Sequence, residues 1–425
     1  MNYRKSFFVY GGFFGDEGKG TTTDFLASHN DIKIVMKCCG GAQAAHFVHR
    51  DDGKKFRFSQ FGSSSSPVIT IIDQDFIIEP ISMMEEARAL SDFWDIPEKQ
   101  ITSNIYISRH ANIATPINRA RNVILEMKLR HGSCGFGIGE TRRISREHPE
   151  RKLTALGTLI TNTKKLLLRQ KEAVLNEFPL HSVNKEIIER NPVIYGNDEI
   201  IDKIAEFYTW WSKQINIVSD ETIKNTISDE PVVFESTQGT LLDENYGFHP
   251  YTTWSSVTPD SVDRIVRRYK YKIDIENLMV IRTYMTRHGC AYLKTGIKDQ
   301  ETWTKLSEGE DNTFNTFQGE LRLGSFDFGL LKYSSDMTNP DAIMLTHGDK
   351  FVKGWETISP EYEFLTPRCV EDSVINSKEY QRLMDYNRKE FDTLEDFIDE
   401  IQKVSYTSIK YLSSGKTKND KEIRS

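Results

Sequence analysis

An acid pair and a lysine inside a glycine-rich segment have the clearest chemical potential in this chain. Asp16, Glu17 and Lys19 stand within Gly11–Gly20, directly after an apolar run at 7–10 that is typical of a buried strand. A strand, a glycine turn and a helix N-terminus form an anion site, because free backbone N–H groups and the helix dipole converge there. The segment therefore predicts a phosphate-binding loop, against the alternative of a glycine turn with a surface lysine.

The spacing departs from the common phosphate loop, which has Gly, four residues and then Gly-Lys-Ser/Thr. Phe13 stands where the first glycine belongs, and Gly20 replaces the hydroxyl residue that binds magnesium. An acid in such a loop repels phosphate unless it holds a metal or takes up a proton. Asp16 is therefore a candidate for metal binding or for general-base chemistry.

The elements that must position this loop alternate between apolar strands and amphipathic helices. Expected strands cover 7–10, 32–39, 68–72, 76–78, 105–108, 232–235, 278–281, 342–345 and 409–412. Expected helices begin near Asp24 and cover 80–90, 117–130, 153–177, 198–215 and 394–405. This alternation predicts an α/β fold with a large, mostly parallel central sheet and helical and loop subdomains, whose ligands bind at the carboxyl ends of the strands.

Length and composition limit the possible classes of protein. The 425 residues are expected to form one domain over 1–417, with a helical insertion at about 153–228 and a disordered tail at 418–425. No apolar run reaches the roughly 18 residues of a membrane span, and the basic start at 1–5 is not a signal peptide. A net charge of −7 argues against broad nucleic-acid binding. We therefore expect neither a membrane nor a nucleic acid as partner.

The cysteines favour a reducing, cytoplasmic location. There are five of them, an odd number, and they do not form a CxxC pair: Cys38, Cys39, Cys134, Cys290 and Cys369. This pattern argues against a zinc site and against a disulfide framework.

Eight loops, in order along the chain, together resemble the adenylosuccinate synthetase family. GDEGKG at Gly15–Gly20 matches the family's first loop in full, and ESTQGTLLD at Glu235–Asp243 matches its EGAQGTLLD. The other matches are GGAQAAHF at Gly40–Phe47, SCGFGIGE at Ser133–Glu140, HPYTTWSSVT at His249–Thr258, MTRHG (family STRVG) at Met285–Gly289, THGD at Thr346–Asp349 and SSGK at Ser413–Lys416. The resemblance implies a homodimeric, Mg²⁺-dependent ligase that joins IMP to L-aspartate with GTP, through 6-phosphoryl-IMP.

The resemblance also implies roles for individual residues. Asp16 matches the base for the purine N1 proton, His46 the acid at the γ-phosphate, and Gln238 the donor to the 6-oxygen, with Lys19 as the loop cation. The implied GTP-binding residues are Gly15, Glu17, Gly18, Lys19, Gly20, Asp349, Ser414 and Gly415. The implied monophosphate-binding residues are Gln43, Cys134, Arg151, Gln238 and Thr253. Mg²⁺ would be bound by Asp16 and the Ala45 carbonyl, and Arg322 remains in the amino-acid loop.

Departures from the family pattern keep other substrates open. Cys134 and Phe136 replace a threonine and an arginine, so the nucleotide pocket has lost hydrogen-bond donors. The family's arginine-rich TTGRRRRTGW segment reads FQGELRLGSF at 317–326, where Arg322 alone survives and Glu320 adds an acid. Arginine forks suit carboxylates and have no easy substitute. The alternatives are a different nucleotide such as dGMP, a different amine, or a purine-nucleotide sensor or assembly component with weak or no ligase activity.

Overall fold

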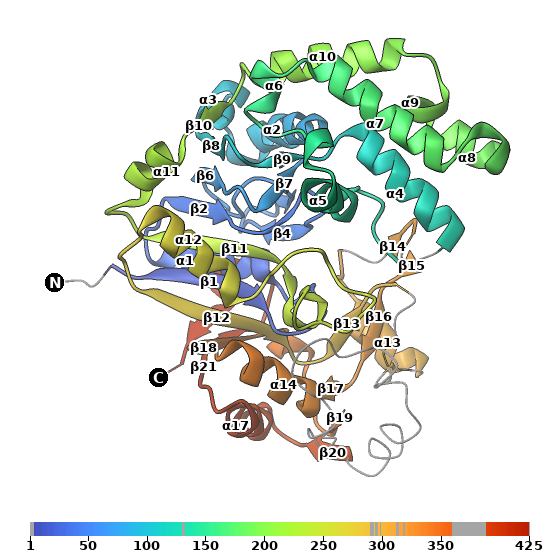
Figure 1. The fold of residues 1–425 in the computed structure, drawn as a ribbon. Coiled ribbons are helices and arrows are strands. Elements are labelled where there is room, and N and C mark those ends of the chain that lie inside the picture. The colour runs from blue at the N-terminus through green and yellow to red at the C-terminus, as the bar shows by residue number, and fades with distance from the viewer. Residues whose placement is uncertain are drawn as a thin grey trace.

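The fold is known from a computed structural model, which describes residues 4–129, 132–289, 293, 296–297, 299–311, 314–317, 319–358 and 388–424. Cys290 and Cys369 lie outside the described residues. A ten-stranded sheet has the order β10-β8-β6-β2-β11-β1-β12-β18-β21-β22 (Figure 1). Its strands are β1 Ser6–Gly11, β2 Ile34–Lys37, β6 Ile69–Ile72, β8 Ile105–Ser108, β10 Asn216–Val218, β11 Val232–Gly239, β12 Ile275–Arg282, β18 Ala342–Thr346, β21 Ile409–Ser413 and β22 Lys421–Ile423.

All neighbouring strands of this sheet are parallel except the last pair, in which β22 runs antiparallel to β21. The fold class expected from the sequence, an α/β fold with a large, mostly parallel sheet, is therefore confirmed. The central strands are buried on both faces, which is why they read as continuous apolar runs. Phe7 and Val9 of β1 enter one core cluster, and Phe8 and Tyr10 enter the other.

Helices cover both faces of the sheet. The core cluster on one face includes residues of α1 Lys19–His29, α2 Pro80–Trp94, α4 Pro116–Leu129, α7 Thr163–Glu177 and α10 Glu199–Trp211. The other packs against α11 Asp220–Ile227, α12 Pro259–Tyr269, α14 Phe328–Thr338 and α17 Leu394–Ser405. The remaining helices are α3 Glu98–Ser103, α5 Ile138–Glu147, α6 Gly157–Ile160, α8 Lys185–Arg190, α9 Pro192–Tyr195 and α13 Gln300–Ser307. No helix of the described residues is long and apolar enough to cross a membrane.

Five small sheets surround the carboxyl ends of the main strands. They pair β13 Met285–Arg287 with β16 Arg322–Gly324, β14 Phe314–Asn315 with β15 Gly319–Glu320, and β4 His46–His49 with β5 Lys55–Phe58. The two three-stranded sheets are β17 Phe326–Asp327, β19 Trp355–Ile358 and β20 Arg388–Phe391, and β3 Gly40–Gly41, β7 Phe76–Ile78 and β9 Asn112–Ile113. These short strands hold the loops that the sequence identified as motifs.

Three expectations from the sequence need correction. The first helix begins at Lys19 instead of near Asp24, because Gly18 caps it in a left-handed conformation without a side-chain hydrogen bond. The insertion at 153–228 is not purely helical, since β10 within it extends the main sheet beside β8. The tail is not disordered over 418–423, because β22 pairs with β21 there. Figure 1 shows α6 to α10 gathered as one helical layer at the β10 end of the molecule.

Candidate active site

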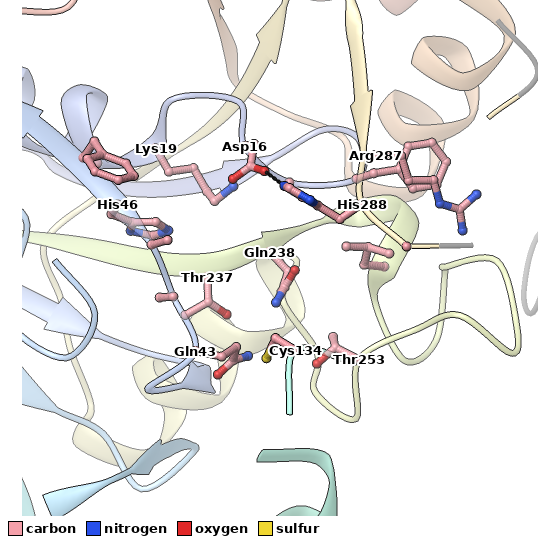
Figure 2. A pocket seen from close by; sticks show the side chains of 18 of the residues that line it. Asp16, Lys19, Gln43, His46, Cys134, Thr237, Gln238, Thr253, Arg287 and His288 are labelled. Atoms are coloured by element: carbon pink, nitrogen blue, oxygen red, sulfur yellow. Dashed lines mark hydrogen bonds and ion pairs between the residues drawn. The ribbon is translucent and has the colours of Figure 1, made fainter. Parts of the chain in front are cut away.

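A cavity of about 540 Å³ opens where the carboxyl ends of the central strands meet. Its walls come from the matched motifs, from Arg121, Asn122 and Leu125 of α4, from Arg282 and from the segment at 308–311. Thirteen of the residues expected from the sequence line it: Gly15, Asp16, Gly18, Lys19, Gly20, Gln43, Ala45, His46, Cys134, Gln238, Thr253, Asp349 and Gly415. Figure 2 shows His46, Lys19, Asp16 and Gln238 facing one space, with Gln43 and Cys134 beyond Gln238. Residues from the first, middle and last thirds of the chain therefore meet here.

The glycine-rich loop joins β1 to α1 and depends on an internal acid. Glu17 is buried, and its Oε1 accepts hydrogen bonds from Phe13 N at 3.1 Å and Gly15 N at 2.8 Å. Its Oε2 lies 2.6 Å from the Lys19 ammonium. Glu17 is absent from the lining of the cavity among the described residues, although the sequence placed it among the GTP contacts. It holds the loop backbone and Lys19 in place instead.

Asp16 is the acid of the loop that does reach the cavity. Its Oδ2 lies 2.8 Å from Nε2 of His288, and its backbone oxygen accepts a hydrogen bond from Nε of Arg282. Burial raises the pKa of Asp16, but the hydrogen bond from His288 and the charges of His288, Arg282 and Lys19 together lower it to about 2. The Asp16 carboxylate is therefore ionised at neutral pH, as a proton acceptor must be.

His46 is oriented by a buried carboxylate that the sequence reading did not select. Nδ1 of His46 bonds Oε1 of Glu235, a fully buried residue of β11. Glu235 also lies 3.0 Å from the Lys37 ammonium and accepts a hydrogen bond from Ser63 N at 3.2 Å. Burial lowers the pKa of His46, and Glu235 partly offsets this. Nε2 of His46 is buried without a hydrogen-bond partner among the described residues, so it is available to a ligand.

Other unpaired polar atoms lie on the side of the cavity expected to bind the monophosphate. Oε1 of Gln43 and Oγ1 of Thr237 are buried and have no hydrogen-bond partner among the described residues. The backbone at Gly40 has φ of +76°, and a Cβ there would lie 1.9 Å from Oγ1 of Thr237. Burial raises the pKa of the Cys134 thiol, which makes it a weak donor in this wall. Buried polar groups without partners are rare in folded proteins, and they suit a polar ligand.

The turn at 346–349 forms the wall expected to recognise the base of GTP. Asp349 lines the cavity within a 3-10 turn, and its neighbour His347 stands in the left-handed region with φ of 60°. Burial and the nearby charge of Arg282 hold the pKa of His347 well below its usual range, so this side chain is neutral. Ser414 does not line the cavity among the described residues; its backbone N bonds the Asp420 oxygen at 3.0 Å. The neighbouring Gly415 does line it.

Two expected arginines lie elsewhere. Arg151 lines a separate cavity of about 110 Å³, and its Nε is 3.3 Å from Oε1 of Glu150. Arg322 belongs to β16 and is absent from the main cavity's lining among the described residues. Arg287, its Cα partner on β13, lines the cavity in its place.

The sequence reading missed His288, Glu235 and Lys37. Each of them lies within or beside a matched motif, so the positions were in view. His288 offered one signal, because a titratable residue stands there where the family pattern has valine. The partners of His288 and Glu235 are 272 and 189 residues away, so spacing alone could not reveal the pairs.

The described residues fit a magnesium ion shared with phosphate ligands. They hold no group of three His, Cys, Asp or Glu side chains suited to a metal. Mg²⁺ does not require one, since it is usually held by one or two carboxylates, waters and substrate phosphates. Asp16, an ionised oxygen donor, and Ala45 both line the cavity beside the phosphate loop. Asp16 and the Ala45 carbonyl are the residues that would hold the ion.

Comparison with known sequences finds the same family over nearly the whole chain. A family model for adenylosuccinate synthetase matches residues 8–421. Adenylosuccinate synthetase of Thermotoga maritima is 27% identical over 433 residues, covering 97% of this chain and 98% of that protein. The enzyme of Halothermothrix orenii is 28% identical over 352 residues, covering 80% of this chain and 76% of that protein.

Two solved structures share the fold at low sequence identity. Fully ligated adenylosuccinate synthetase from Plasmodium falciparum superposes with a TM-score of 0.76 at 19% identity, covering 99% of this chain and 100% of that one. Succinoaminodeoxyadenylate synthetase of cyanophage S-2L, bound to dGMP and to dATP as an energy donor, gives 0.58 at 14% identity, covering 99% and 96%. Since the family model spans nearly the whole chain, the protein belongs to the adenylosuccinate synthetase family of C–N bond-forming ligases.

Proposed function

We propose that this protein is a purine-nucleotide ligase that uses GTP and Mg²⁺ to activate the 6-oxygen of IMP and then forms a C–N bond to L-aspartate. One observation carries the proposal: an ionised Asp16 and an unpaired Nε2 of His46 line the same cavity as the glycine-rich loop. These are the two proton-handling groups that activation of a 6-oxopurine by a nucleoside triphosphate needs.

The first step is phosphoryl transfer to the 6-oxygen. Asp16 accepts the N1 proton, which turns the 6-oxygen into a nucleophile that attacks the γ-phosphorus as the bond to GDP breaks. Gln238 donates a hydrogen bond to the developing negative charge on the 6-oxygen. His46, held by Glu235, faces the transferring phosphoryl group through Nε2. Asp16 and the Ala45 carbonyl would hold Mg²⁺, which would neutralise part of the phosphate charge.

The second step replaces the new 6-phosphate by an amine. The amine nitrogen attacks C6, the C–N bond forms, the C–O bond breaks, and phosphate leaves with the amine proton transferred to solvent or to a base in the site. Phosphate is a far better leaving group than the oxide ion it replaces.

Asp349 supports GTP as the donor, because a carboxylate is a bidentate acceptor for the two N–H donors of guanine.

A different amine is the second candidate, and the arginines of the cavity favour it. Arg121 is bound to Glu140 and Glu177, while Arg282 is bound to Glu310 at 2.6 and 3.1 Å. A dicarboxylate such as aspartate needs cationic forks for both carboxylates. Of the four arginines that line the cavity among the described residues, three already pair with carboxylates of the protein: Arg121, Arg143 and Arg282. An amine with a single carboxylate would need fewer.

Product analysis decides between these candidates. The protein is incubated with GTP, Mg²⁺, and IMP or dGMP, together with aspartate, glycine, alanine or ammonium, and the products are identified by mass spectrometry. The proposal predicts succinyl-AMP from IMP and aspartate. A product from another amine only, or from dGMP only, supports the corresponding alternative substrate. Tight binding of nucleotides without any new product would contradict ligation and favour a nucleotide sensor.

The proposed enzyme acts as a homodimer. In the family pattern an arginine reaches the nucleotide phosphate of the partner subunit, and Arg151 is the residue of this chain that matches it. Its position outside the main cavity of its own subunit is compatible with such a role. Light scattering of the purified protein would test the dimer, and a monomer at working concentration would contradict it.

A further inference from the structure

Each of residues 286–288, in and directly after β13, contacts one residue of the glycine-rich loop at 14–16. Oγ1 of Thr286 donates a hydrogen bond to the Gly15 oxygen at 3.2 Å, and Nε2 of His288 lies 2.8 Å from Oδ2 of Asp16. Between them, the guanidinium of Arg287 lies 4.0 Å from the centre of the Phe14 ring. Three consecutive residues of one segment therefore hold three consecutive residues of the loop. Figure 2 shows the contact between Asp16 and His288 as a dashed line.

Asp16 has an uncommon backbone conformation, and its side chain is held by a separate contact. Its φ of 58° lies in the left-handed region, where residues other than glycine are sparsely populated. Its backbone oxygen is fixed by Arg282. Backbone contacts leave the two side-chain torsions of an aspartate to be set separately. The contact with His288 fixes them. The side chain of Asp16 is only 22% exposed and that of His288 only 14%.

The chemistry of the two groups determines the direction of this hydrogen bond. An ionised carboxylate can only accept, so Nε2 of His288 carries the hydrogen and donates it. The strand that precedes His288 is held in place, because β13 is buried and pairs with β16. The Cα partners are Met285–Gly324, Thr286–Leu323 and Arg287–Arg322. The valine of the family pattern at this position could pack but could not donate.

We infer that His288 is a positioning residue, whose Nε2–H holds the Asp16 carboxylate where it meets N1 of the purine in the first chemical step. This inference rests on the proposed function. A carboxylate held in one orientation reaches its proton without a further search, and loss of such positioning commonly lowers a rate by about 10- to 100-fold. His288 acts through Asp16 and does not itself touch the reacting atoms.

Kinetics of the first step test the inference. Positional isotope exchange in GTP labelled at the β–γ bridging oxygen is measured with IMP and Mg²⁺ and without amine. We expect His288→Val to lower the exchange rate at saturation about 10- to 100-fold, with the affinities for GTP and IMP changed less than about threefold. His288→Gln keeps an N–H donor and is expected to recover most of the rate. His181→Gln, at an exposed histidine of the insertion, is the control and should match the wild type.

Three results would overturn the inference. One is an exchange rate for His288→Val equal to that of the wild type. The second is an equal loss for His288→Gln and His288→Val, and the third is a loss explained by a lower folded fraction, since either of these would indicate a packing role.

A measurement independent of turnover separates this inference from the proposed function. NMR of protein labelled with ¹⁵N-histidine resolves the ring signals of ten histidines, and His288→Gln assigns the one that matters. We expect that signal to move when Asp16→Asn is introduced. A His288 ring signal at the same position in Asp16→Asn and in the wild type would contradict the contact. Wild-type protein without any isotope exchange contradicts the proposed reaction, and the ring signal still decides whether His288 holds Asp16.

Discussion

At the scale of single residues, the site depends on buried acids that differ in their task. Asp16 faces the cavity, Glu17 braces the loop, and Glu235 orients His46. Burial raises the pKa of Glu235, but the charges of Lys37 and His46 and the hydrogen bonds from His46 and Ser63 lower it to about 2. Glu235 therefore stays charged in the interior, because it is surrounded by partners. Removing its charge lowers the free energy of unfolding by a measurable amount.

The stability of the protein should depend on pH through Glu235. The pKa is 4.5 ordinarily and about 2 in the folded protein, so ionised Glu235 stabilises the fold above pH 4.5, and this contribution is lost as pH falls toward 2. Glu235→Gln also leaves Lys37 buried without its partner, and we expect a loss of about 3–5 kcal/mol at pH 7. Urea unfolding across pH should show the difference between variant and wild type shrinking in acid.

The matched control for this prediction is Glu230→Gln. Glu230 forms an exposed pair with Arg4 at 3.3 Å, and such pairs contribute about 0–1 kcal/mol. A difference for Glu235→Gln that stays constant with pH, or that does not exceed the Glu230→Gln value, would contradict the assignment of Glu235 as a charged interior group.

At the scale of elements, short strands and glycine turns fix the motif loops against each other. β3 holds the start of the loop that carries Gln43 and His46, and Gly40 lies directly against Thr237 of β11. A side chain at Gly40 has no room there. This contact sets the distance between the loop and the strand that carries Glu235 and Gln238.

Two glycines with similar backbones allow a test of this contact. Gly40 has φ of +76° and Gly53 has φ of +84°, so alanine is strained at both, at a cost of about 1–2 kcal/mol. A Cβ at Gly53 meets nothing within 4 Å, whereas one at Gly40 lies 1.9 Å from Thr237 Oγ1. We expect Gly40→Ala to cost at least about 2 kcal/mol more in urea unfolding than Gly53→Ala, and to lower isotope exchange. Equal effects of the two substitutions would contradict the close contact.

The elements could be predicted from sequence where burial dominates. β1, β6 and β18 read as apolar runs because both faces of each are buried. The start of α1 was placed too late, since the left-handed cap at Gly18 has no side-chain signature. The strand β22 was missed because two of its three residues, Glu422 and Ile423, are exposed. A short exposed segment of this kind resembles a disordered tail.

Prediction of the site followed the same division. Residues inside the motifs, such as Asp16, His46 and Gln238, were found because their spacing is local. His288 and Lys37 depend on pairs formed across the sheet, and no local pattern encodes such pairs. Arg322 was placed at the site from its segment alone, and its side chain lies outside the lining of the main cavity among the described residues.

At the scale of the whole molecule, the last strand closes the edge of the sheet beside the site. β22 pairs with β21, whose continuation at Gly415 and Lys416 lines the cavity. Lys421 of β22 is largely buried, and burial lowers its pKa to about 8 against the opposing effect of Asp420 and Asp24. The C-terminal residues therefore belong to the folded unit.

Removal of residues 418–425 tests this closure. The deletion exposes the hydrogen-bonding edge of β21, and we expect a loss of about 1–3 kcal/mol and a lower midpoint of thermal unfolding. A weaker affinity for GTP should accompany it, because Gly415 and Lys416 lose their support. A deletion variant with wild-type stability and GTP affinity would contradict the role given to β22.

In the proposed reaction, Asp16 takes the N1 proton while GTP phosphorylates the 6-oxygen of a purine nucleotide. Positional isotope exchange in bridge-labelled GTP, with IMP and Mg²⁺ and without amine, reports this step alone. We predict IMP-dependent scrambling in the wild type and at least about a 100-fold loss in Asp16→Asn, since the amide cannot accept the proton while asparagine tolerates the left-handed backbone. Scrambling at the wild-type rate in Asp16→Asn, or none in the wild type, would contradict the role of Asp16 as the base in this reaction.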